Sequence, residues 1–335
     1  MKALAFDKNG LENLKYTDYK DPSVGNHDVL IKVKMAGVNP IDYYTVNTLK
    51  VNPIPHIPGV EFSGEVVKVG EHVKNVKVGD RVTIYGKIFD GTCDMCMSGY
   101  ETVCRNGGRI GVDTNGGWAE YISVEEKYVF KLPEEYGLEV ASSLTVSALT
   151  AYHSLKEANL RPSETLVVFG ASGNTGMFLV QLGKKFGAKV IAVSRKKWLK
   201  DFGADLVVDY NDVEEKVREF TNGKMADVVV NSLGQKFWDK SFSIVGIRGK
   251  IVNFGTLLGA EVKVNLSQLY SKHISILGVN RGNRKDFVEL LELCKDCKVK
   301  TWKIYNLENG VEALNGLFSD DRDGRIFIKI DWKNN

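Results

Sequence analysis

The stretch from residue 165 to residue 180 restricts the fold of this chain more than any other part of the sequence. Its first five residues, Thr165–Phe169, are apolar or β-branched, which is typical of a strand buried on both faces. Three glycines follow at three-residue spacing, and apolar residues then continue at helical spacing. A strand, a glycine turn and a helix in this order predict a phosphate-binding βα unit, with a pyrophosphate at the helix N-terminus. The residues expected to line it are Gly170, Ser172, Gly173, Asn174, Thr175 and Gly176.

An ordinary βα turn without a ligand is the alternative, and a second apolar strand at Lys189–Val193 favours the phosphate site. The end of this second strand indicates which dinucleotide is preferred. An NAD site has an acidic residue there, which accepts hydrogen bonds from the ribose hydroxyls. This chain instead has Ser194 followed by three cations, Arg195, Lys196 and Lys197. Cations suit a 2′-phosphate, so the sequence predicts NADP(H); a solvated basic helix start is the alternative.

Composition limits the remaining possibilities. The chain has 335 residues, enough for two domains, with 43% hydrophobic and 26% charged residues. A net charge of +3 is too small to argue for a nucleic-acid or membrane partner. The N-terminus lacks the apolar core of a signal peptide, and no run is long enough to span a membrane. Five cysteines, an odd number, favour a reducing compartment, so we expect a cytoplasmic protein.

The pattern of apolar residues changes near residue 142. Residues 1–141 alternate short strands with glycine turns, which predicts a β-rich, barrel-like domain. Residues 142–282 alternate strands with helices such as 213–221 and 236–244, which predicts an α/β domain with a doubly wound parallel sheet. Residues 283–335, with a helix and a terminal strand, are expected to complete the first domain. The strands expected in the parallel sheet are 165–169, 189–193, 206–210, 227–232, 250–255 and 274–279.

This order of domains resembles the medium-chain dehydrogenase/reductase family, and the resemblance covers the whole chain. It implies a GroES-like catalytic domain and a Rossmann cofactor-binding domain. The motifs specify the family much more closely than they specify a substrate. Besides the glycine turn they are Gly37-Val-Asn-Pro-Ile-Asp42, Pro58-Gly-Val-Glu-Phe-Ser-Gly64, Val78-Gly-Asp-Arg-Val82, Gly116-Gly-Trp-Ala-Glu-Tyr121 and Leu149-Thr-Ala-Tyr152.

A cysteine-containing segment resembles the structural zinc lobe of the family. Cys93 and Cys96 form a CxxC pair, and Cys104 follows after seven intervening residues. Family members with this lobe carry a fourth cysteine at the position of Asp90. Because a carboxylate also binds zinc well, the resemblance implies a closed structural Zn²⁺ site made of Asp90, Cys93, Cys96 and Cys104. A degenerate lobe with free or oxidised thiols is the alternative.

The catalytic zinc site of the family's alcohol dehydrogenases is not retained. Its three ligand positions fall on Asn39, Val60 and Val146, and the hydroxyl residue of the proton relay falls on Ile41. Glu61 remains, but one carboxylate does not hold a metal. The chain therefore resembles the zinc-free, quinone-oxidoreductase-like branch, with a structural zinc lobe still attached.

In that branch, the residues that match Asn39 and Tyr44 lie beside the nicotinamide. Without a metal, a hydrogen-bond donor must stabilise the oxyanion or enolate formed on hydride transfer, and Tyr44 is the best candidate. Asn39 is expected to hold the carboxamide or the substrate oxygen, and an aromatic wall is the alternative role of Tyr44. The resemblance adds Tyr210 near the 2′-phosphate. Phe254 and Gly255 follow a strand end, where ligands bind in such sheets.

The pair Cys294 and Cys297 forms a second CxxC motif, which lacks a βαβ context and nearby zinc partners and is expected to be structural. We thus expect an NADPH-dependent oxidoreductase that transfers hydride to an enone, a quinone or an activated carbonyl without catalytic zinc. A zinc-type alcohol or sugar dehydrogenase with an atypical metal site and a non-catalytic NADPH-binding protein are the alternatives. The resemblance also implies a homodimer or homotetramer, paired through the last strand of the parallel sheet, Ser275–Val279.

Overall fold

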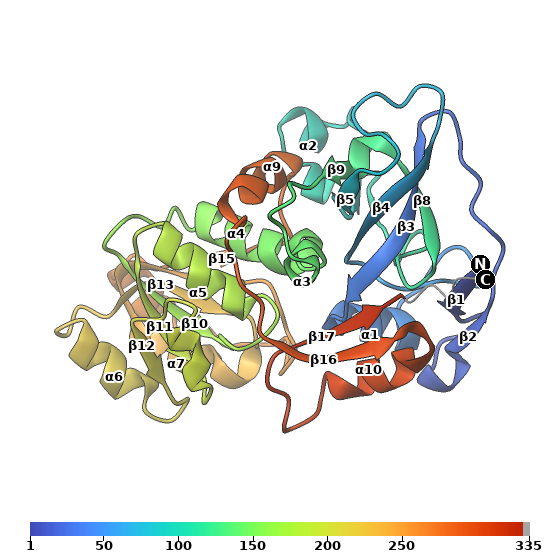
Figure 1. Cartoon of the computed structure of the whole chain (residues 1–335). Helices are drawn as coiled ribbons and strands as arrows, with labels where there is room; N and C mark the ends of the chain where they lie inside the picture. Colours follow the sequence, from blue (N-terminus) through green and yellow to red (C-terminus); the bar gives the residue numbers. More distant parts are fainter. Residues whose placement is uncertain (331–335) are drawn as a thin grey trace. The chain divides into compact units, whose positions relative to one another are not determined.

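The computed structural model describes residues 1–330 and divides into two compact units. Among these residues, the first unit consists of 1–146 and 283–330, and the second consists of Ser147–Gly282. In Figure 1 the first unit is coloured from blue to green and, for its C-terminal part, orange-red, and the second unit from green through yellow to orange.

The second unit is built on a six-stranded parallel sheet in the order β12-β11-β10-β13-β14-β15. This is the predicted doubly wound fold: the order reverses at β10, which is buried along its whole length. Its strands are β10 (Thr165–Phe169), β11 (Lys189–Val193), β12 (Leu206–Val208), β13 (Ala226–Asn231), β14 (Val245–Asn253) and β15 (Ser275–Gly278). Its helices are α4 (Leu149–Glu157), α5 (Gly176–Lys185), α6 (Val213–Phe220), α7 (Trp238–Ile244) and α8 (Leu266–Ser271).

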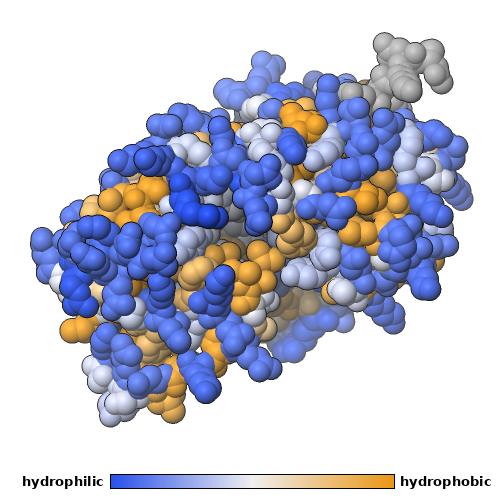
Figure 2. All heavy atoms as spheres, turned by 90° about the horizontal axis from the view of Figure 1, so that it is seen from below, coloured by the Kyte–Doolittle hydropathy of each residue, from blue (hydrophilic) through white to orange (hydrophobic). Residues whose placement is uncertain are grey.

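The edge strand β15 is exposed at three of its four residues. Several large apolar side chains between residues 247 and 276 of the second unit are also exposed. Figure 2 shows that apolar side chains gather in patches on one face of an otherwise largely hydrophilic surface. The exposed apolar residues of β14, β15, α8 and the segment between β14 and α8 are Ile247, Leu257, Leu258, Val262, Leu266, Tyr270 and Ile276.

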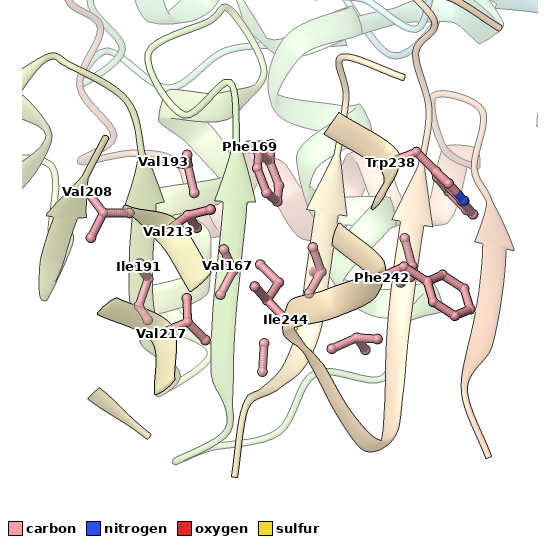
Figure 3. Close-up of a cluster of buried hydrophobic side chains, with 14 of the residues drawn as sticks. Val167, Phe169, Ile191, Val193, Val208, Val213, Val217, Trp238, Phe242 and Ile244 are labelled. Atoms are coloured by element: carbon pink, nitrogen blue, oxygen red, sulfur yellow. The ribbon is translucent and has the colours of Figure 1, made fainter. Parts of the chain in front are cut away.

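The core of the second unit lies between one face of the sheet and helices α6 and α7 (Figure 3). Val167 and Phe169 of β10 contribute to it from the sheet, and Val213, Val217 and Phe242 from the helices. Helix α5 covers the other face, where a side chain at Gly183 would collide with Leu166. Helices therefore cover both faces, as apolar strands without polar alternation require.

The first unit is built on a seven-stranded sheet in the order β16-β17-β3-β4-β5-β9, with β8 also paired to β3. The long strand β3 alternates buried and half-buried residues, as expected for a strand with one face on the core. These strands are β3 (Asp28–Gly37), β4 (Phe62–Val69), β5 (Arg81–Ile84), β8 (Tyr121–Glu125), β9 (Val129–Lys131), β16 (Thr301–Asn306) and β17 (Arg325–Lys329). Smaller pairs are β1 (Lys2–Ala5) with β2 (Lys15–Asp18) and β6 (Lys87–Ile88) with β7 (Gly108–Arg109).

One helix of the first unit carries the candidate donor Tyr44 and was not predicted from the sequence. Tyr43 and Tyr44 lie on a helix, α1 (Pro40–Asn47), whose N-cap is Asn39. Pro40 stands at its first position, and the Asp42 carboxylate accepts the backbone N–H of Asn39, which is the chemistry of a helix start. The other helices are α2 (Asp94–Met97), α3 (Leu138–Ala141), α9 (Arg284–Leu293) and α10 (Gly310–Gly316).

Cys294 and Cys297 follow α9, are buried, and form a disulfide. Their sequence pattern predicted a structural pair, but the reducing compartment expected from the cysteine count would favour thiols, so the disulfide departs from that second expectation. Over residues 1–330, none of the helices has the length and apolar character needed to cross a membrane.

Candidate cofactor, metal and catalytic residues

The glycine turn between β10 and α5 has the tight backbone that a phosphate site requires. Gly170 has a φ of +68°, a left-handed conformation that glycine adopts without strain. A Cβ atom on Gly176 would lie 2.2 Å from the Gly170 carbonyl oxygen, so the helix can begin this close to the strand only with glycine there. The N-terminus of α5, an element of ten residues, follows directly on this turn, and the positive end of its helix dipole favours an anion there. Ser172, Gly173, Asn174 and Thr175 complete this turn.

Ser194 connects the glycine turn to the basic segment after β11. It is buried, its hydroxyl donates to the Ser172 hydroxyl at 3.0 Å, and it accepts the Lys196 backbone N–H at 3.1 Å. The side chains of Arg195 and Lys197 are exposed, and Lys196 is half-buried. The structure therefore places these cations at the end of β11, beside the turn.

Tyr210 lies at the same edge of the sheet, after β12. Its ring centroid is 4.6 Å from that of Phe237 and 6.4 Å from that of Phe169. Burial raises the pKa of the Tyr210 hydroxyl, and a hydrogen bond to the Gly170 backbone and the charge of Arg195 oppose this shift. Those contacts bring together Tyr210, the glycine turn and Arg195, three parts of the predicted site that are far apart in sequence.

Phe254 and Gly255 follow β14 at the carboxyl edge of the sheet. The Asn253 side chain donates to the carbonyl oxygens of Asn231 and Gly255 at 3.0 and 2.9 Å and so holds the ends of β13 and β14 together. A Cβ on Gly255 would lie 2.5 Å from the Ser232 carbonyl oxygen, so the backbones run close together here. The predicted cofactor residues of the second unit thus lie at the ends of β10, β11, β12 and β14.

The predicted metal ligands come together in the first unit. One ligand atom from each of Asp90, Cys93, Cys96 and Cys104 can be chosen so that all four lie within 4.8 Å of one another. One carboxylate and three thiols at this spacing fit a tetrahedral zinc ion of the structural kind. Cys294 and Cys297 are outside this group.

Hydrogen bonds hold the Asp90 carboxylate in place. Its Oδ1 accepts the backbone N–H groups of Thr92 and Cys93 at 2.8 and 3.0 Å, and its Oδ2 accepts the Asn106 amide at 2.6 Å. These bonds hold the pKa of Asp90 well below its usual range. Backbone hydrogen bonds also lower the pKa of Cys93, whereas burial raises the pKa of Cys96 to about 12, so that a nearby cation would be needed to favour its thiolate.

The two proposed catalytic residues differ in accessibility. Tyr44 lies on α1 with 37% of its surface exposed, beside Tyr43 at 6.0 Å between ring centroids. Asn39 is only 3% exposed, and its Nδ2 donates to Glu61 Oε2 at 2.9 Å. Asn39 is therefore directed into the protein, and Tyr44 is the member of the pair that can meet a ligand.

A buried arginine joins this cluster, and the sequence pattern did not identify it. Arg325, the first residue of β17, donates to Glu61 Oε2 at 2.5 Å, and both side chains are fully buried. Glu61 Oε1 accepts the backbone N–H of Val146 at 2.7 Å. The signal that could have revealed it is a charged residue at the start of an apolar run, Arg325-Ile-Phe-Ile, because a charge in a buried strand requires a partner.

Comparison with known proteins gives consistent matches over both units. Residues 25–134 match the family described as alcohol dehydrogenase GroES-like domain, and residues 174–296 match zinc-binding dehydrogenase. An NAD-dependent alcohol dehydrogenase of Sulfolobus acidocaldarius is 35% identical over 98% of this chain and 100% of its own length.

Two solved structures bear on the chemistry. The thermostable alcohol dehydrogenase of Pyrobaculum aerophilum superposes with a TM-score of 0.91 at 37% identity, covering 98% of this chain and 99% of that one. A quinone oxidoreductase of Pseudomonas syringae pv. tomato superposes with a TM-score of 0.80 at 27% identity, covering 98% and 99% of the two chains.

Proposed function

Because this chain belongs to the medium-chain dehydrogenase/reductase family, we propose that it is an NADPH-dependent reductase of enones, quinones or activated carbonyls that uses no catalytic zinc. The observation that carries this proposal is the set of contacts around Glu61. The three positions expected to hold a catalytic zinc are Asn39, Val60 and Val146, none of which is a zinc ligand of the usual kind. Glu61, the carboxylate next to Val60, accepts hydrogen bonds from the Asn39 amide, the Val146 backbone N–H and the Arg325 guanidinium.

The chain's own residues support each part of this function. The glycine turn and the N-terminus of α5 would bind the pyrophosphate, and Arg195 and Lys196 would bind a 2′-phosphate. The nicotinamide, when bound, supplies the hydride. The Tyr44 hydroxyl would donate a hydrogen bond, and then a proton, to the oxygen on which negative charge develops. Zinc at Asp90, Cys93, Cys96 and Cys104 would stabilise its lobe without taking part in the chemistry.

A second function is favoured by the relatives themselves. The proteins of Sulfolobus acidocaldarius and Pyrobaculum aerophilum are named alcohol dehydrogenases, and the first is named NAD-dependent. A zinc-type alcohol dehydrogenase with NAD is therefore the competing function. The basic segment at Arg195 and the residues at the three ligand positions are the features of this chain that argue against it.

One set of assays separates these functions. The purified protein is incubated with NADPH or NADH and a panel of enones, quinones and aldehydes, and with NAD(P)⁺ and a panel of alcohols, while the reduced nicotinamide is followed by absorbance. We expect turnover with NADPH and at least one acceptor class, and about one zinc per chain by elemental analysis. A second zinc together with alcohol oxidation would establish the competing function, and tight NADPH binding without any turnover would indicate a non-catalytic protein.

Tyr44→Phe tests the proposed donor in the same assay, with Tyr43→Phe as the matched control on the same helix. Loss of the donor is expected to lower kcat by roughly a hundredfold, because general acid catalysis contributes about that much or more. The control should retain activity. Equal losses in the two variants would reject Tyr44 as the donor and favour its role as an aromatic wall.

We also propose that the protein is a homodimer, or a homotetramer built from such dimers, in which the β15 strands of two copies pair. The strand is apolar at Ile276 and Leu277 and lies at the open edge of the parallel sheet. The cytoplasm remains the expected location.

A further inference from the structure

The carboxylate of Glu61 is the centre of a buried network in the first unit. Its Oε1 accepts the Val146 N–H, and its Oε2 accepts both the Asn39 amide and the Arg325 guanidinium. Arg325 also approaches the Asn39 side-chain oxygen at 3.5 Å. A fully buried charged pair is therefore in contact with the N-cap residue of α1.

Stability alone does not account for this pair. Desolvation offsets much of the attraction between two buried charges, so apolar side chains of similar size often give equal or better stability. Arg322, a second arginine, stands three residues before Arg325 in the sequence. Burial and the charge of Arg325 lower the pKa of Arg322 to about 10. Arg322 donates to the carbonyl oxygens of Gly324 and Leu317 at 2.9 and 3.2 Å. Glu61 is thus the acidic partner of Arg325, whose charge also acts on Arg322.

The network fixes the beginning of α1 from two sides. On one side Glu61 binds the side chain of Asn39. On the other side the Asp42 carboxylate, also fully buried, accepts the backbone N–H groups of Asn39 at 2.8 Å and of Val60 at 3.1 Å. Two adjacent residues before β4, Val60 and Glu61, therefore hold the first turn of the helix whose second turn carries Tyr44.

We propose that Glu61, with Arg325 as its counter-ion, is a positioning residue that holds the start of α1 and so presents the Tyr44 hydroxyl to the acceptor. This inference rests on the proposed function, in which Tyr44 donates the proton. Neither Glu61 nor Arg325 needs to touch the acceptor, because both act through Asn39 and the helix. The effect on rate arises because a donor displaced by about 1 Å can lose roughly a hundredfold in rate.

The test uses Glu61→Gln, which keeps the shape of the side chain and removes its charge. Glu65→Gln is the matched control: it lies on β4, and its carboxylate pairs with Lys34 at 3.4 Å on a partly exposed surface. We expect E61Q to lower kcat about ten- to a hundredfold, with the dissociation constant of NADPH changed less than about threefold, and E65Q to change neither. The double variant E61Q/R325M removes both charges and replaces E61Q where the single variant does not fold.

A double-mutant cycle with Tyr44→Phe shows whether Glu61 acts through Tyr44. If it does, E61Q lowers kcat in the wild-type background and has little further effect in the Y44F background. Multiplicative losses in the two backgrounds would overturn the inference, and so would weakened NADPH binding with kcat unchanged.

Hydrogen exchange of residues 40–47 gives a readout that does not depend on turnover. Faster exchange in this segment is expected in E61Q and not in E65Q, and equal exchange in the two variants would overturn the positioning role. If the wild-type protein reduces no acceptor, the proposed function fails by that result alone. If the wild-type protein is active and the cycle is multiplicative, only the present inference fails.

Discussion

At the scale of single residues, the proposed chemistry depends on where charges lie and whether they are buried. Arg195 and Lys197 are exposed cations at the end of β11, where they can meet a charged ligand. Arg325 is a buried cation that is bound to Glu61 and is unsuited to contact an acceptor directly. Asp90 is a carboxylate fixed by backbone N–H groups, so its oxygens are already oriented in the metal lobe.

The preference for NADPH is tested at Arg195. Arg195→Ala should weaken NADPH binding about tenfold to a hundredfold, because a charge-assisted hydrogen bond contributes roughly 1.5–3 kcal/mol, and NADH binding should change little. Lys189→Ala is the control, since Lys189 is an exposed cation at the opposite end of the same strand. Both dissociation constants are measured by nicotinamide fluorescence. Equal affinities for NADH and NADPH in the wild-type protein would contradict the preference.

The role of Asp90 is tested by changing the fourth ligand. Asp90→Ala should lower zinc affinity about a hundredfold or more. Mutation of a residue that only hydrogen-bonds to a metal ligand already lowers metal affinity roughly ten- to a hundredfold. Asp90→Cys should restore tight binding by completing a set of four thiolates. Asp94→Ala removes an exposed ion pair with Arg105 and leaves the four ligands in place, so it is the control. Affinity is measured by competition with a chromogenic chelator, and an unchanged affinity in D90A would exclude Asp90 as a ligand.

At the scale of elements, the sequence predicted the buried parts of the fold better than the exposed ones. The strands β10 and β11 are continuous apolar runs, and their predicted bounds match the structure. Strand β16 was not predicted, because its residues are half-buried or exposed and give no clean alternation. Helix α1 was also not predicted, although Asn39, Pro40 and Asp42 are a recognisable helix start.

The candidate site shows the same limit. The glycine turn and the CxxC pair are local motifs, so their residues could be named from sequence spacing alone. The contact between Glu61 and Arg325 joins positions 264 residues apart. The charge at the start of the apolar run from Arg325 indicates that a partner is needed but does not identify Glu61, and the antiparallel pairing of β17 with β3 is what brings β17 beside this part of the sheet.

Removal of metal should affect an element outside the metal lobe. Just before Cys104, the Glu101 carboxylate accepts the Arg284 N–H at 2.8 Å, and the Thr102 N–H donates to the Asn283 side chain at 3.3 Å. These bonds hold the start of α9, since Asn283 is its N-cap. Chelation should therefore speed hydrogen exchange at residues 283–287 as well as 93–104, and leave α5 unchanged. Exchange confined to the lobe would show that α9 does not depend on the metal.

At the scale of the whole molecule, each of the two large sheets has an edge strand that exposes an apolar side chain. β15 forms one open edge of the parallel sheet, and its Ile276 is 40% exposed. β16 forms one open edge of the seven-stranded sheet in the first unit, and its Ile304 is 47% exposed. An unprotected apolar edge is a surface on which another copy can pair, and a two-fold axis through β15 would join two parallel sheets into one.

The pairing of copies is tested by placing a lysine on each edge. Ile276→Lys should convert a dimer into monomers, or a tetramer into smaller species, because a charge on an edge strand opposes strand pairing. Ile304→Lys makes the same change on the other edge and should leave the assembly intact; molar mass is measured by light scattering after size exclusion. A wild-type monomer, or dissociation by I304K alone, would contradict the β15 interface. NADPH binding should persist in I276K, because the glycine turn and Arg195 follow β10 and β11, which β13 and β14 separate from β15.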